Sequence, residues 1–279
     1  MLSQEWFQQL PLPQISGVTP VSGGDINLAF RVTANGKDYF VKVQPNHPAS
    51  YFDHEKAGLA ALEQAVTVPH PVESGAIGGH AYLILTWVDE GRGDQYALGQ
   101  AVAHLHQLTA PKFGFASDHT TKVLTKNNAW NPDWGNFYLR QRLEPEVAAA
   151  RKQGVWNDWR DRHYQQMAAA IGDYYANHQV PVSLLHGDLW AGNFLFDAAS
   201  TPVLIDPDAV YGDREFDLAM TTVFGGFDDR FYAGYQSVWP FEAGLDQRLP
   251  WYRFYYLCMH LILFGEGYGP SVDRILAKY

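Results

Sequence analysis

The sequence predicts an α+β fold in two lobes, with a small β-rich N-terminal lobe and a mostly helical C-terminal lobe. Short strand-like runs gather before about residue 87, and helical spacing of apolar residues dominates most of the chain after residue 95. A polar stretch with two glycines, DEGRGD at 89–94, separates the two patterns as a linker would. We therefore predict an N-terminal domain at residues 1–87 and a C-terminal domain at residues 88–279.

The N-terminal lobe is predicted to contain a hairpin, a helix and a further strand. The runs NLAFRVTA (27–34) and KDYFVKVQ (37–44) flank Asn35-Gly36, a dipeptide that favours the tight turn of a β-hairpin. Residues 53–64 carry apolar side chains three to four apart, which predicts a helix. The continuous apolar run at 81–88 indicates a buried strand.

The C-terminal lobe is predicted to be helical around a small strand-bearing insert. Helical patterns cover residues 95–108, 136–152 and 156–178 and most of the chain from residue 209 to residue 279. Three short strand candidates, SLLHG, NFLFD and PVLIDPD, form the insert. The segment 112–134 has no clear periodicity, and its length and composition are compatible with a lid or a substrate wall.

Composition and charge exclude several classes of protein. The formal net charge is −10, which argues against nucleic acid as the main ligand. Cys258 is the only cysteine, so an intrachain disulfide and a zinc–thiolate cluster are both excluded. The N-terminus lacks the pattern of a signal peptide, and no apolar run is long enough to span a membrane. We expect a cytoplasmic protein without a membrane partner; the oligomeric state cannot be read from the sequence.

The stretch LLHGDLWAGNFLFD, residues 184–197, carries the strongest chemical signal. Asp188 and Asn193 stand five residues apart, with His186 two residues earlier, which matches the H-x-D-x-x-x-x-N of a protein-kinase-type catalytic loop. That spacing lets a carboxylate reach an attacking hydroxyl while the amide curls back to a metal ion. The alternative is a plain turn, because Asp and Asn favour turns. Trp190 is equally compatible with a core anchor and a substrate contact.

Three further motifs accompany the catalytic loop. Along the chain the order is glycine turn, lysine–glutamate pair, catalytic loop and strand-end aspartate, as in a protein-kinase-type enzyme. Asp206 ends the apolar run VLID, where a second metal ligand is expected, although a strand-end cap is the alternative. Lys42 lies in a strand among apolar neighbours and needs a carboxylate or phosphate partner, for which Glu55 on the next helix is the candidate. Gly23-Gly24 precedes the hairpin and allows backbone N–H groups to approach phosphates, or forms an ordinary turn.

Taken together, these signals predict phosphoryl transfer from ATP. Asp188 would orient the substrate hydroxyl and accept its proton. Asn193 and Asp206 would hold Mg²⁺, which prefers oxygen ligands, and Lys42 would hold the phosphates.

Nearly the whole chain resembles the fructosamine kinase (ketosamine-3-kinase) family. The resemblance rests on GGDINLAFRV, FGF at 113–115, WNPDWGNFYLRQRLEPE, HGDLWAGN, IDPDAVYGDREFDLAM, FGGF and FGEGYG. The Trp after HGDL and the YG-x-RE-x-DLAM run distinguish this family from aminoglycoside and choline kinases. The resemblance implies a protein-kinase-like fold and ATP- and Mg²⁺-dependent phosphorylation of a ketosamine at its 3-hydroxyl. The product then breaks down and frees the amine. The resemblance also implies that the adenine of ATP contacts the hinge between the lobes at Thr86, Trp87 and Val88.

The stretch after Asp206 departs from the usual motif of the family, which reads I-D-P-A, then two aromatic residues, then G-H-R-E. Here Asp208 and Asp213 are added, so residues 206–217 hold five acids and one Arg. A cationic amine would be attracted to such a cluster. The candidate substrate residues are Trp190, Asp208, Tyr211 and Glu215. Alternatively, Glu215 and Asp217 are structural, and for Asp217 we favour capping a helix or tethering the catalytic loop, with His186 as a second supporting residue.

The departures leave the substrate open among fructosamine, ribulosamine and erythrulosamine, and between free and protein-bound amines. A kinase for an aminoglycoside, choline or another amino alcohol is the main alternative. A metal-dependent hydrolase using His186, Asp188, Asp206 and Asp208 would leave Lys42 and Glu55 without a role. The intact catalytic set argues against an inactive binding protein.

Overall fold

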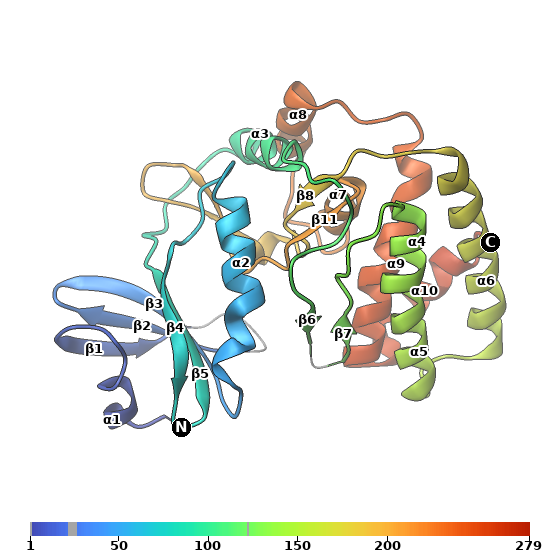
Figure 1. Cartoon of the computed structure of the whole chain (residues 1–279). Helices are drawn as coiled ribbons and strands as arrows, with labels where there is room; N and C mark the ends of the chain where they lie inside the picture. Colours follow the sequence, from blue (N-terminus) through green and yellow to red (C-terminus); the bar gives the residue numbers. More distant parts are fainter. Residues whose placement is uncertain (1, 22–26, 122) are drawn as a thin grey trace.

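The computed structural model describes residues 2–21, 27–121 and 123–279 and has the predicted two lobes (Figure 1). An antiparallel sheet forms the N-terminal lobe, and helices form most of the C-terminal lobe, as the α+β prediction requires. The last strand of the N-terminal sheet ends at Thr86 and the next helix starts at Gln95, so the predicted boundary at residues 87/88 lies in the segment that connects the lobes.

The N-terminal sheet has five strands in the order β1-β2-β3-β5-β4. The strands are β1 (Ile15–Pro20), β2 (Leu28–Ala34), β3 (Lys37–Gln44), β4 (Pro71–Ile77) and β5 (His80–Thr86). A short helix α1 (Gln4–Phe7) packs on one face, and α2 (Asp53–Leu62) follows a 3₁₀ turn, η1 (Ala49–Phe52). Figure 1 shows α2 between the sheet and the C-terminal lobe.

The predicted hairpin is confirmed as β2 and β3. Asn35 and Gly36 both have positive φ angles, 48° and 72°, as expected for the two central residues of a type I′ turn. The resulting register places Lys42 opposite Ala29 on one side and Leu83 on the other. Lys42 is thereby fixed in the middle of the central strand of the sheet, where its side chain cannot stay solvated.

The C-terminal lobe is built around the long helix α9. Its helices are α3 (Gln95–His106), α4 (Trp134–Tyr138), α5 (Glu144–Lys152), α6 (Asp158–Asn177), α7 (Glu215–Met220), α8 (Asp229–Val238), α9 (Leu245–Phe264) and α10 (Gly269–Leu276). A π-helical turn, η2 (Leu139–Leu143), joins α4 to α5, so the helix predicted over 136–152 is present with an irregular middle. Two 3₁₀ turns complete the set, η3 (Ala191–Asn193) and η4 (Glu266–Tyr268).

Short two-stranded ladders hold the loops that carry the chemistry. They are formed by β8 (Ser183–Leu185) with β11 (Val210–Gly212), β9 (Phe194–Phe196) with β10 (Pro202–Leu204), and β6 (His119–Thr120) with β7 (Thr125–Lys126). The loop 186–193 therefore runs from β8 to β9, and the loop 205–209 runs from β10 to β11. Each loop connects the β8–β11 ladder with the β9–β10 ladder, so the side chains of the two loops converge.

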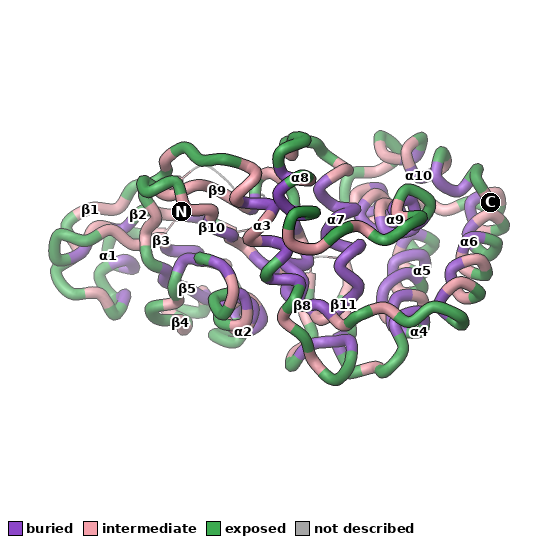
Figure 2. Tube along the Cα trace, turned by 90° about the horizontal axis from the view of Figure 1, so that it is seen from above, coloured by how far each residue is buried: buried purple, intermediate pink, exposed green. Residues whose placement is uncertain are grey.

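Two apolar clusters stabilise the lobes. Trp6, Phe7 and Leu10 pack on Val32 and Val41 on the outer face of the N-terminal sheet. A larger cluster runs from the inner face of that sheet through the C-terminal lobe, and Figure 2 shows buried residues along α9, α7 and β8. In the described part of the chain, no helix combines the length and apolar character needed to cross a membrane.

Candidate active site

An ion-pair network joins the two lobes at Lys42. Its Nζ lies 2.8 Å and 2.9 Å from the two carboxylate oxygens of Glu55 on α2 and 3.0 Å from Oδ1 of Asp206 in the C-terminal lobe. Burial alone would lower the pKa of Lys42, but the carboxylates of Glu55 and Asp206 outweigh it and raise the pKa, so the ammonium group stays charged. The predicted Lys42–Glu55 pair is present, and Asp206 is the third member.

Asp206 is held in an uncommon backbone conformation. Its φ is +54°, in the left-handed region that few residues other than glycine adopt. Its side chain is 38 % exposed, so a cation bound to ATP phosphates can reach the carboxylate. The backbone N–H of the preceding residue, Ile205, donates to the Asn193 carbonyl at 3.0 Å. The structure thus brings the two predicted metal ligands, Asn193 and Asp206, side by side.

Asp188 and Asn193 close the catalytic loop onto itself. Nδ2 of Asn193 donates to the Asp188 carbonyl oxygen at 2.8 Å and to Asp188 Oδ2 at 3.0 Å. Burial raises the pKa of Asp188 to about 7, with a further contribution from the nearby Asp208 carboxylate, while Lys126 acts in the opposite direction. A carboxyl group with a pKa near neutrality suits a general base.

Asp217 tethers the loop, as the structural alternative predicted. Its side chain is fully buried on α7, and its two carboxylate oxygens accept the backbone N–H groups of His186 at 2.7 Å and Gly187 at 2.9 Å. His106 on α3 contacts the same carboxylate at 3.2 Å. Gly187 has a φ of +83°, and a Cβ there would collide with the Asp208 carbonyl oxygen, so the loop requires glycine at this position.

His186 supports the loop rather than the chemistry. Its Nε2 lies 2.9 Å from the Ile205 carbonyl oxygen, which can only accept, so Nε2 carries the proton. Nδ1 then accepts the Asp188 backbone N–H at 3.3 Å. Burial lowers the pKa of His186, which keeps the ring in this neutral form. His186 therefore links the catalytic loop to the segment that carries Asp206.

Asp208 does not face an open substrate site. Its carboxylate forms an ion pair with Lys126 and contacts His119 Nδ1 at 2.8 Å and His54 Nε2 at 3.1 Å. Although burial would raise the pKa of Asp208, Lys126 and His119 lower it well below the usual range. The residues that satisfy Asp208 come from α2 and from segment 112–134, whose part in the site the sequence did not reveal.

Within the acidic stretch 206–217, Asp206 is the exposed carboxylate, whereas the side chains of Asp213 and Glu215 are buried. Both carboxylate oxygens of Glu215 bond the Arg248 guanidinium, at 2.6 Å and 2.7 Å, and both side chains are buried. Asp213 accepts from the hydroxyl groups of Tyr252 at 2.7 Å and Tyr175 at 3.1 Å. The carboxylates of Asp213 and Glu215 are thus occupied by partners inside the protein and are not free to attract an amine. Glu215 does not join the central site.

Aromatic side chains lie beside the catalytic loop. Trp190 is 40 % exposed, so it is not a core anchor, and its ring covers Gly192 closely enough to exclude a Cβ there. Tyr211 on β11 lies 5.9 Å, ring centre to ring centre, from Trp130, an exposed residue that the sequence did not single out. Trp190, Tyr211 and Trp130 are therefore available for an external ligand.

The other predicted nucleotide contacts lie at the edge of the described site. Thr86 ends β5, where its hydroxyl accepts the His70 backbone N–H at 2.9 Å. The Trp87 ring lies under the Arg31 guanidinium at 4.7 Å, and Val88 follows in the connecting segment. Gly23 and Gly24 lie outside the described residues.

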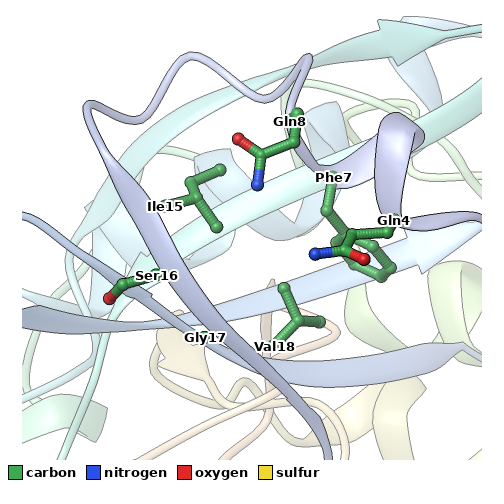
Figure 3. Close-up of a pocket in the computed structure, with 7 residues that line it drawn as sticks. All are labelled: Gln4, Phe7, Gln8, Ile15, Ser16, Gly17 and Val18. Atoms are coloured by element: carbon green, nitrogen blue, oxygen red, sulfur yellow. The ribbon is translucent and has the colours of Figure 1, made fainter.

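A separate hollow lies on the far side of the N-terminal lobe, between α1 and β1 (Figure 3). Figure 3 shows Phe7, Ile15 and Val18 beside the amide side chains of Gln4 and Gln8. None of the residues that converge on Lys42 or Asp188 lines it. We assign the chemistry to the centre between the lobes and not to this hollow.

The lysine–glutamate pair, the Asp188–Asn193 loop and Asp206 at a strand end together define a phosphotransferase of the protein-kinase-like class. Within that class, the chain belongs to the fructosamine kinase family, whose profile matches residues 2–279. The match spans both lobes and every described residue of the central site.

Relatives of the chain carry related names. A Lactiplantibacillus plantarum protein named a probable ketoamine kinase is 50 % identical over 100 % of this chain and 99 % of its own. A protein-ribulosamine 3-kinase of Arabidopsis thaliana, described as chloroplastic, is 35 % identical over 95 % of this chain and 83 % of its own.

Solved structures agree in fold. A Thermobifida fusca crystal structure assigned to the fructosamine-3-kinases has a TM-score of 0.87 and 28 % identity and covers 99 % of this chain and 98 % of its own. An aminoglycoside phosphotransferase solved with AMP-PNP and hygromycin B has a TM-score of 0.69 and 16 % identity over 99 % of this chain and 98 % of its own. The second likeness extends to the fold alone.

Proposed function

We propose that the protein transfers the terminal phosphoryl group of ATP to the 3-hydroxyl of a ketosamine, as a repair step for glycated amines. The observation that carries the proposal is the meeting of Lys42, Glu55 and Asp206 with the Asp188–Asn193 loop in a chain of the fructosamine kinase family. The 3-phosphate of a ketosamine is unstable, so its breakdown would free the amine. The cytoplasm is the proposed location of this reaction.

Asp188 is the proposed base. A pKa of about 7 leaves a substantial fraction of its carboxyl groups ionised at neutral pH, ready to accept the hydroxyl proton as the oxygen attacks phosphorus. Asn193 holds the carboxylate in place, and Asp217 and His186 hold the loop. Catalysis then consists mainly of positioning and charge stabilisation.

The remaining roles concern ATP and magnesium. Lys42, positive and fixed by Glu55, is the proposed ligand of the phosphates. Asn193 and Asp206 offer oxygen donors, the ligand type that Mg²⁺ prefers, and the exposure of Asp206 gives the ion access. When bound, Mg²⁺ would neutralise charge on the phosphates. We assign the adenine to Thr86, Trp87 and Val88 and the phosphate-facing backbone to Gly23 and Gly24, as the resemblance implies.

The sugar is proposed to lie against Trp190 and Tyr211. Aromatic faces pack well on the apolar faces of sugars, and the half-exposed Trp190 adjoins Asp188 in the loop. The names of similar proteins include a fructosamine-3-kinase and a protein-ribulosamine 3-kinase, so we propose fructosamine and ribulosamine as substrates and leave both free and protein-bound amines in the set to be tested. Asp208 and Glu215 are left out of the proposed contact set because their carboxylates are paired internally.

The test measures ATP consumption with a panel of lysine derivatives that carry a fructosamine, ribulosamine or erythrulosamine group. Choline and kanamycin serve as comparison substrates. We expect turnover of at least one ketosamine and none of the comparison substrates. Turnover of choline or kanamycin with no ketosamine activity would refute the proposal.

A further inference from the structure

His54, His119 and Asp208 form a convergent cluster that the proposed phosphoryl transfer does not use. Each of the three residues has one ligand atom, a ring nitrogen or a carboxylate oxygen, within 4.8 Å of a ligand atom of the other two. The two imidazole nitrogens both approach the same oxygen, Asp208 Oδ1, at 3.1 Å and 2.8 Å. The two imidazole rings are stacked nearly parallel, with 4.7 Å between their centres, so each leaves the other free to approach Asp208.

Two imidazoles and one carboxylate are a donor set suited to transition-metal dications. In a tetrahedral zinc site with bonds of about 2.1 Å, the ligand atoms lie about 3.4 Å apart. The two nitrogen–oxygen distances at Asp208, 3.1 Å and 2.8 Å, are about 0.3 to 0.6 Å shorter than that distance, and small side-chain rotations can make up the difference. Three protein ligands leave a fourth position for water or another ligand.

The groups behind the three ligands are also in place. Nδ1 of His54, the ring nitrogen away from Asp208, lies 3.2 Å from the Ser117 hydroxyl, and Lys126 bonds the second oxygen of Asp208. Histidine and carboxylate ligands of metal ions are commonly oriented by such second hydrogen bonds. The Phe115 ring packs edge-on against His54 at 5.3 Å and supplies an apolar wall.

Local charge favours a cation despite Lys126. Asp206 lies in the same loop as Asp208, and Glu55 is the next residue after His54 on α2. With Asp208, these three acids outnumber Lys42 and Lys126, and Asp188 adds negative charge as it ionises around its pKa of about 7. An added dication would therefore enter a region with an excess of negative charge.

We propose that His54, His119 and Asp208 bind one transition-metal dication of the Zn²⁺ type, at a site distinct from the Mg²⁺ ligands Asn193 and Asp206. His54 lies on α2 of the N-terminal lobe, Asp208 in the C-terminal lobe and His119 in segment 112–134. The bound ion would therefore join three parts of the molecule and stabilise the docking of α2 against the C-terminal lobe. This inference does not depend on the proposed substrate.

The test is Zn²⁺ binding to the untagged full-length chain in metal-free buffer, measured by titration calorimetry, with Co²⁺ absorption as a second probe. We expect one site per chain and a rise in melting temperature on addition of Zn²⁺. His119→Ala is the main variant because this ring is 33 % exposed and its loss leaves the core intact. It should weaken Zn²⁺ binding about tenfold or more, and Asp208→Asn should do the same.

The matched control is His70→Ala. His70 also sits beside a carboxylate, Glu63 at 3.3 Å, but on the surface with 63 % exposure, and its loss should leave Zn²⁺ affinity unchanged. Binding that survives both His119→Ala and Asp208→Asn but is lost in Asp206→Asn would assign the ion to the magnesium ligands and overturn the proposal. Absence of one-to-one binding would overturn it as well.

Discussion

The catalytic loop at 186–193 and the segment at 112–134 both reach the same centre, but they are built differently. The loop is held by hydrogen bonds between its own residues, such as Asn193 to Asp188, and by the buried Asp217 carboxylate, which accepts two of its backbone N–H groups. The segment is held by the short ladder of β6 and β7, by backbone bridges from Phe113 to Asn131 and from Gly114 to Tyr211, and by the buried Asn128. It places Lys126 and His119 against Asp208. The loop thus positions the proposed base and metal ligands, whereas the segment supplies charged partners to the acid beside them.

The largest effect should come from removing the proposed base. Asp188→Asn should lower kcat by about a hundred- to ten-thousand-fold, the usual contribution of a positioned general base. ATP binding should persist, because Lys42 and Glu55 are unchanged. Steady-state kinetics and nucleotide titration check both; near-normal turnover would contradict the assignment.

The same substitution should stabilise the fold. The pKa of Asp188 is raised to about 7 in the folded chain, so the folded state holds a proton that the unfolded state releases at lower pH. This partly buried carboxyl group therefore costs stability increasingly as the pH rises from its ordinary pKa to about 7. Asp188→Asn should raise the melting temperature at pH 8 and change it little at pH 4; a decrease at pH 8 would count against the raised pKa.

Loss of the interlobe lysine should weaken the use of ATP. Lys42→Met removes a charged donor, and a loss of about ten- to a hundredfold in kcat/KM for ATP is expected. Lys56→Met is the matched control on α2, because Lys56 bonds only the Ser74 hydroxyl at 2.8 Å among the contacts of the described chain. Equal ATP kinetics for the two variants would place the phosphates elsewhere.

A smaller effect should link Lys126 in the segment 112–134 to the pKa of Asp188 in the catalytic loop. The positive charge of Lys126 lowers the pKa of Asp188, against the larger effect of burial, so Lys126→Met should raise that pKa. Because only the ionised carboxylate can act as base, activity rises with pH through this pKa, and the rising limb of kcat/KM should move to higher pH. Lys112→Met, in the same segment, should leave this rising limb in place; a shift to lower pH in Lys126→Met would contradict the effect of the Lys126 charge on the pKa of Asp188.

The smallest effect on catalysis is expected at Glu215. Because its carboxylate bonds Arg248, Glu215→Gln should lower the melting temperature while the KM for a ketosamine stays within about twofold of the wild-type value. Thermal denaturation and substrate kinetics on the same preparation separate the two. A large rise in KM with unchanged stability would restore Glu215 as a substrate residue.

The sequence predicted most of the central machinery because the signals were local. Asn35-Gly36 determines the hairpin that buries Lys42, and the spacing of Asp188 and Asn193 lies within one loop. Strands β1 and β4 were missed because they are edge strands: Pro20 and Gly17 interrupt the pattern of β1, and no residue of β4 is fully buried.

What the sequence could not reveal were partners far apart along the chain. Glu215 and Arg248 are separated by 33 residues, and Lys126 and Asp208 by 82. Acids that are paired in this way look like an exposed cluster when only neighbouring residues are compared. A signal was present at Lys126 and His119, which are ionisable residues in a segment without periodicity, but nothing in the sequence indicated which side they face.

The position of the phosphate on the product tests the central claim most directly. The wild-type protein, Mg·ATP and a ribulose- or fructose-derived lysine should be followed by phosphorus and proton NMR. We expect one phosphomonoester on the 3-oxygen of the sugar, formed in step with ADP and absent with Asp188→Asn. A phosphate on another oxygen, or ADP formed without a phosphorylated ketosamine, would contradict the account.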